Sequence, residues 1–106
     1  MKFGVIISTN DPETCWNALR FANYSLSKGH EVQVFFLGKG VEYQTIGTEA
    51  FNTVKQADKF ASSGGTIFAC GSCIKSRGKE GNEMCPISTM DDMYNVVMDS
   101  DKIVTF

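Results

Sequence analysis

Short apolar runs rich in β-branched residues alternate along this chain with stretches of helical period, and this alternation constrains the fold more than any other feature. The first run, at 3–8, lacks the polar alternation of a half-solvated strand, which indicates a strand buried on both faces. We predict strands at 3–8, 31–37, 66–69 and 102–106 and helices at 12–28, 49–61, 71–77 and 89–99. No hairpin signal joins successive strands. Crossover connections then favour a three-layer, doubly wound α/β fold with a mainly parallel sheet of four to five strands.

Helix-capping residues sharpen these boundaries. Asp11 is placed to cap the first helix, with Pro12 at its first position, where a missing N–H costs little. Ser88 or Thr89 is placed to cap the last helix. The stretch 41–48 is poorly patterned, and we expect a loop or a single helical turn there.

Length and charge exclude several classes of protein. The chain has 106 residues, which fits one domain spanning 1–106. Ten Lys and Arg residues, spread along the chain, are outnumbered by twelve Asp and Glu residues, which argues against nucleic-acid binding. No apolar run approaches the ~20 residues needed to span a bilayer, and the opening run is too short for a signal-peptide core. We therefore expect a cytoplasmic protein with no membrane partner.

The chemistry is concentrated in the cysteines. Of the four, Cys15 is expected to pack beside Trp16 in the first helix, whereas Cys70 and Cys73 follow a predicted strand. Ligands of open α/β sheets collect at the carboxyl ends of the strands, which here are 8–11, 38–40, 70–73 and 106. Two further residues are candidates for lining that cleft. They are Asn10 and Cys85, the latter ending a charged loop at 79–83.

The segment from 70 to 78 favours a reactive thiol. Cys70 stands where a strand ends and a helix begins, and the amides and dipole of a helix start favour a thiolate over a thiol. We expect the N–H groups of Gly71 and Ser72 to stabilise an anionic sulfur there, with Arg77 adding positive potential. Cys73 follows one turn later on the same face, so its sulfur can reach that of Cys70.

The residues alone leave four interpretations of this segment open. The cysteines could be structural. They could form a zinc site with Cys85, although the chain's one histidine, His30, is distant and leaves the fourth ligand unassigned. They could form a dithiol oxidoreductase of thioredoxin type, although the motif lacks an aromatic residue before its first cysteine. Finally, Cys70 could carry sulfur as a persulfide. We expect no metal and no cofactor.

The order of motifs resembles the DsrE/DsrF/TusD-like sulfur-relay family, which has the YchN-like fold. The stretch Cys70-Gly-Ser-Cys-Ile-Lys-Ser-Arg77-Gly78 matches its cysteine segment, in which Arg-Gly closes the helix after the cysteine. Four other stretches resemble small archaeal and bacterial members, so that the likeness covers essentially the whole chain: 3–8, 16–26, 29–38 and 101–106.

The resemblance implies a compact subunit of a homotrimer or homohexamer. It also implies that Cys70 accepts sulfane sulfur from a protein donor and hands it to an acceptor thiol. Cys73 departs from the family, whose members usually carry a small apolar residue there. This second thiol could resolve a persulfide to a disulfide and release sulfide, or protect the site by reversible oxidation. A dithiol redox protein and a non-catalytic oligomeric binding subunit remain the alternatives.

The chain has more aromatic side chains than a core of this size must hide, which would also suit an oligomer. We expect a subunit interface to absorb surplus aromatic residues, namely Trp16, Phe35, Phe36 and Phe106. The last predicted helix carries one apolar face that we expect to fill the core or a subunit interface: Met90, Met93, Tyr94, Val97 and Met98.

Overall fold

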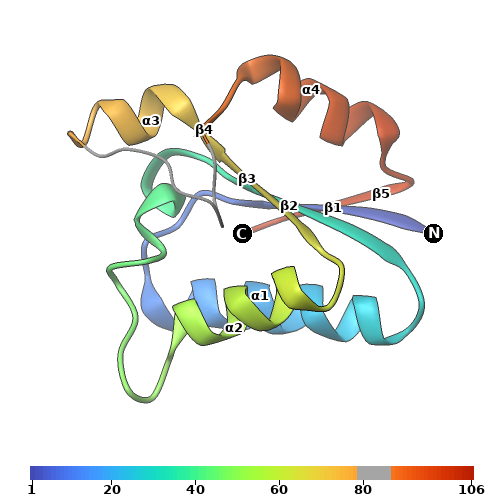
Figure 1. The fold of residues 1–106 in the computed structure, drawn as a ribbon, viewed down its shortest axis with the longest axis horizontal. Helices are drawn as coiled ribbons and strands as arrows, with labels where there is room; N and C mark the ends of the chain where they lie inside the picture. Colours follow the sequence, from blue (N-terminus) through green and yellow to red (C-terminus); the bar gives the residue numbers. More distant parts are fainter. Residues whose placement is uncertain (79–86) are drawn as a thin grey trace.

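The computed structural model describes residues 1–78 and 87–106, which form a parallel sheet flanked by helices (Figure 1). The strands are β1 (Lys2–Ile7), β2 (Glu31–Phe36), β3 (Thr66–Cys70), β4 (Ile87–Ser88) and β5 (Lys102–Thr105). The helices are α1 (Pro12–Ser27), the 3₁₀ helix η1 (Gly38–Glu42), α2 (Thr53–Ser62), α3 (Gly71–Lys75) and α4 (Met90–Asp99). The sheet order is β4-β3-β2-β1-β5, and every pairing is parallel. The predicted doubly wound α/β class is confirmed.

Helices cover both faces of the sheet. In Figure 1, α1 and α2 lie against one face and α4 crosses the other. The register assigns side chains to these layers: Ile6, Phe35 and Phe68 are paired across three strands and therefore share one face. Phe3 lies on the opposite face, where its ring stacks on Phe21 of α1 at 6.3 Å between centroids. The core thus forms two layers, one on each side of the strands.

Two of the predicted caps form as expected. The Asp11 side chain accepts a hydrogen bond from the backbone N–H of Thr14 at 2.9 Å and begins α1. At the last helix the cap is Thr89, whose side chain and that of Asp92 bond each other's backbone N–H in a capping box. Ser88, the other residue predicted as a cap, belongs to β4, and its hydroxyl accepts from the Ala69 N–H at 3.3 Å.

The structure departs from the predicted elements at the start of one helix and at a short strand. The helix predicted to start at 49 begins at Thr53, because the Asn52 side chain caps it by accepting from the Lys55 N–H at 2.9 Å. The short strand β4 was not predicted, since two residues carry no period, and it forms only because it pairs with the end of β3. The predicted charged loop lies outside the described residues.

The expectation of surplus aromatic residues was also wrong in part. Phe35 and Phe36 are fully buried within the single chain, so they leave nothing for an interface to cover. The exposed apolar surface is instead on α4. Its Val96 is buried and Met93 packs partly against the core, whereas the rest of its predicted apolar face is exposed, namely Met90, Tyr94, Val97 and Met98.

Candidate functional site

Three segments distant in the sequence meet at the carboxyl edge of the sheet. They are the loop after β1 (8–11), η1 after β2, and α3 after β3, as the strand-end argument predicted. The close approach of η1 to β1 requires glycine at position 40, because a Cβ there would overlap the carbonyl oxygen of Ile7. This contact brings η1 alongside the cysteine segment.

Cys70 stands at the N-cap position of α3, at the predicted junction of strand and helix, and its side chain makes no capping hydrogen bond there. Its side chain is only 6% exposed in the single chain, so its sulfur meets little bulk water. The neighbouring strand β4 packs closely against the next residue, because a Cβ on Gly71 would overlap the Ile87 side chain. Ser72, the next residue, is exposed. Glycine at 71 is therefore needed for the packing of β4.

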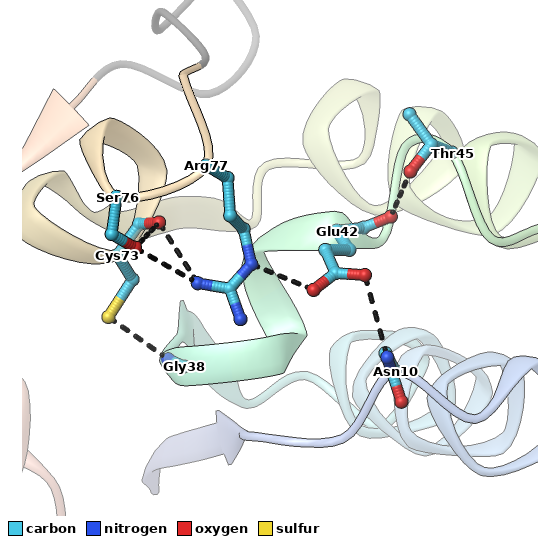
Figure 2. A network of polar contacts seen from close by, with 7 residues as sticks. All are labelled: Asn10, Gly38, Glu42, Thr45, Cys73, Ser76 and Arg77. Atoms are coloured by element: carbon cyan, nitrogen blue, oxygen red, sulfur yellow. Dashed lines mark hydrogen bonds and ion pairs between the residues drawn. The ribbon is translucent and has the colours of Figure 1, made fainter.

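Cys73 is less buried and lies in hydrogen-bond contact with Cys70. This hydrogen bond is the main cause that raises the pKa of the Cys73 thiol, and burial adds to it. Two groups act in the opposite direction. The Gly38 N–H donates to the Cys73 Sγ at 3.3 Å, and Arg77 contributes positive charge (Figure 2). Cys73 therefore holds a proton that it can donate to Cys70.

A polar network joins the same three segments (Figure 2). The Arg77 Nε lies 2.7 Å from the Glu42 Oε2, and both side chains are partly buried. The Arg77 Nη1 also donates to the Cys73 carbonyl oxygen at 3.1 Å. On its other side, Glu42 accepts from the Asn10 Nδ2 at 3.5 Å. Asn10 is thus connected to the cysteine segment through Glu42, a residue that the sequence analysis did not single out.

The remaining candidates lie apart from this network. Cys15 is fully buried in α1, as expected of a packed thiol, and burial with the nearby Asp11 charge raises its pKa to about 12. Cys85 lies outside the described residues. Within 1–78 and 87–106, no group of three or more His, Cys, Asp and Glu side chains is arranged to hold a metal ion. None of the helices in those ranges is both long and apolar enough to cross a bilayer.

Comparison with known proteins identifies the family. The model of the DsrE/DsrF-like family matches residues 1–106. The chain belongs to the DsrE/DsrF-like family. The family that the sequence analysis inferred from the order of motifs is therefore confirmed.

Relatives and solved structures agree with this DsrE/DsrF-like assignment. The chain is 35% identical to the uncharacterized protein MJ0989 of Methanocaldococcus jannaschii over 115 aligned residues, covering all of both chains. It is 33% identical to the uncharacterized protein MK0008 of Methanopyrus kandleri, covering 89% of this chain and 83% of that protein. The crystal structure of the YchN protein from E. coli superposes with a TM-score of 0.84 over all of both chains at 20% identity. That last likeness establishes the fold.

Proposed function

We propose that this DsrE/DsrF-like protein accepts sulfane sulfur as a persulfide on Cys70 and passes it to an acceptor thiol. The observation that carries the proposal is the contact between Cys70 and Cys73 at the carboxyl edge of the sheet. Family membership points in the same direction, toward sulfur relay. A thiol at this edge occupies the position where open α/β folds place their chemistry.

The transfer consists of two thiol exchanges. The Cys70 thiolate attacks the outer sulfur of a donor persulfide, the donor S–S bond breaks, and the donor leaves as a thiolate. An acceptor thiolate then attacks the outer sulfur now held on Cys70, and the Cys70 thiolate leaves. Neither step needs an oxidant or a reductant. The Cys73 thiol donates its hydrogen bond to the departing Cys70 sulfur, and we assign the same stabilising role to the amides of Gly71 and Ser72.

The burial of Cys70 limits how a partner protein can reach its sulfur. Because its side chain is 6% exposed, a donor or acceptor has to present its own sulfur on a protruding segment. We infer that partner proteins approach past Ser72, which is exposed, and Cys73, which is partly exposed. Arg77 has its charge near Cys73 and would favour an incoming thiolate.

The test is persulfide loading followed by intact mass measurement. Cys73→Ser keeps the proposed carrier and removes its neighbour, so we expect it to gain one sulfur atom from a low-molecular-weight persulfide. Adding an acceptor thiol should then remove that sulfur. The double variant Cys70→Ser/Cys73→Ser should gain none, whereas Cys15→Ala/Cys73→Ser should load like Cys73→Ser. A Cys70→Ser chain that gains sulfur while Cys73→Ser does not would assign the carrier to Cys73.

A dithiol redox protein is the second candidate, favoured by the same contact between Cys70 and Cys73. It predicts electron exchange with a dithiol and no stable uptake of sulfur by Cys73→Ser. A non-catalytic binding subunit predicts that neither thiol reacts faster than the packed Cys15. Persulfide loading and alkylation rates separate the three candidates.

We further propose that the protein works in the cytoplasm as a homotrimer or homohexamer. The exposed apolar residues of α4 support an assembly, because a large apolar patch on a small protein commonly marks a contact with a partner. Membership of the DsrE/DsrF-like family supports a homotrimer or homohexamer as the form of this assembly. Three cysteines in the described residues are free thiols, as a reducing compartment would keep them.

A further inference from the structure

We propose that Cys73 is a resolving thiol, which discharges the Cys70 persulfide as hydrogen sulfide and closes a Cys70–Cys73 disulfide. This inference rests on the proposed loading of Cys70 and adds a second activity, sulfane-sulfur reduction, to sulfur transfer. Its substrate class is the persulfide, its product is sulfide, and a dithiol reductant restores the two thiols.

The geometry places Cys73 within reach of the inner sulfur. The two cysteines are three positions apart at the start of α3, and their side chains are already in hydrogen-bond contact. Residues at this spacing on a helix have Cβ atoms about 5–6 Å apart, somewhat more than the roughly 3.5–4.5 Å of a disulfide. Cys70 ends β3 and occupies the N-cap of α3, so its Cβ is not held at the spacing of two helical residues.

The surroundings of Cys73 also suit a nucleophile. Its Sγ accepts from the Gly38 N–H at 3.3 Å, and this donor stabilises negative charge on the sulfur. Arg77 donates to the Cys73 carbonyl oxygen at 3.1 Å, which holds its positive charge beside the same residue. Both groups favour negative charge on the Cys73 sulfur, the form that attacks.

The step balances in atoms and electrons. The Cys73 sulfur attacks the Cys70 Sγ, the bond between that Sγ and the outer sulfur breaks, and the Sγ–Sγ bond forms. The outer sulfur leaves as hydrosulfide and takes the proton from Cys73, giving hydrogen sulfide. The sulfane sulfur is reduced by two electrons, and the two cysteine sulfurs are oxidised to the disulfide.

Burial makes this internal route competitive with transfer. An external acceptor has to reach a side chain that is 6% exposed, whereas Cys73 is in place before the persulfide forms. A reaction between held groups also avoids the entropy lost when two molecules meet. The fate of the sulfur therefore depends on whether an acceptor docks before Cys73 attacks.

The experiment follows sulfide and mass together in the full chain. Reduced wild type, Cys73→Ser, Cys73→Ala, Cys85→Ser and Cys15→Ala are each given one equivalent of a low-molecular-weight persulfide without oxygen. We expect the wild type to release one sulfide per chain and to end two hydrogen masses lighter, with the disulfide mapped to Cys70 and Cys73. Cys85→Ser and Cys15→Ala should behave as the wild type does. Both Cys73 variants should keep the added sulfur and release sulfide at about one tenth of the wild-type rate or below.

Several outcomes would overturn the inference. They are a wild type that stays one sulfur heavier, Cys73 variants that release sulfide at the wild-type rate, and release that is lost in Cys85→Ser but kept in Cys73→Ser. Failure of the proposed carrier function looks different, because then no variant gains sulfur and none releases sulfide.

Discussion

The Arg77 guanidinium and the Glu42 carboxylate form an ion pair, with 2.7 Å between Nε and Oε2, that ties the turn after α3 to η1. The pair is partly buried, and Arg77 uses a second nitrogen to bind the carbonyl oxygen of Cys73. Glu42 therefore positions the backbone that carries the second thiol. Glu42 lies 35 positions before Arg77 in the sequence, and the ion pair therefore makes η1 part of the candidate site.

Replacing Glu42 should loosen this connection. We expect Glu42→Gln to lower the free energy of unfolding by about 1 kcal/mol, because a partly exposed ion pair loses its charge but keeps one hydrogen bond. Urea denaturation measures the change. Glu49→Gln is the matched control, since Glu49 is exposed, and it should leave the midpoint unchanged. Equal effects of the two variants would show that the ion pair adds nothing.

The ionisation of Cys73 should depend on Cys70. The hydrogen bond with Cys70 is the largest cause that raises the Cys73 pKa, and Cys70→Ala removes it together with the charge of the neighbouring sulfur. The Gly38 N–H and Arg77, which lower the pKa, remain. We therefore expect the Cys73 pKa to fall, so that more of it is thiolate at any given pH.

The pH profile of Cys73 alkylation by iodoacetamide, read from the modified peptide, measures this shift. In Cys70→Ala the profile should move to lower pH, whereas in Cys15→Ala it should stay where it is in the wild type. A profile that stays put or moves to higher pH in Cys70→Ala would contradict the assigned hydrogen bond.

A side chain at position 71 should disturb the packing of β4. A Cβ there would overlap the Ile87 side chain, so we expect Gly71→Ala to cost about 1–3 kcal/mol of stability. Ser72→Ala, at the exposed neighbouring position, should cost far less. Thermal and urea unfolding of the two variants provide the comparison, and a neutral Gly71→Ala would mean that β4 moves aside freely.

The α4 surface should control assembly. Tyr94 on α4 is 60% exposed and Tyr24 on α1 is 62% exposed, so the two offer the same residue type on opposite faces of the sheet. We expect Tyr94→Glu to lower the mass measured by light scattering, because a charge cannot be buried in an apolar interface. Tyr24→Glu should keep the wild-type mass. A monomeric wild type at micromolar concentration would dismiss the assembly altogether.

Local patterns predicted the parts of this molecule that depend on neighbours in sequence. The Asp11 cap follows from its place just before Pro12, and the reach of Cys73 to Cys70 follows from a spacing of three residues. Val96 shows the limit of the same reasoning, because helical period defines a stripe on α4 but not which side of it meets the sheet. The buried residue was Val96, and Met90 and Tyr94 stayed outside.

The rest of the site depends on contacts that no local pattern encodes. Glu42 lies in a stretch without clear period, and its only signal was that it follows the end of a strand closely. The Gly38 N–H reaches the Cys73 sulfur across 35 positions of sequence. Predicting such a donor requires the sheet order first, since β2 and β3 must be neighbours before their ends can meet.

Position 40 carries a consequence for how this protein can vary. A single added methyl group there would collide with the Ile7 carbonyl and lift η1, and with it the carboxylate that anchors Arg77. The position of Arg77, and of the Cys73 carbonyl oxygen that it binds, therefore depends on a residue that has no side chain of its own.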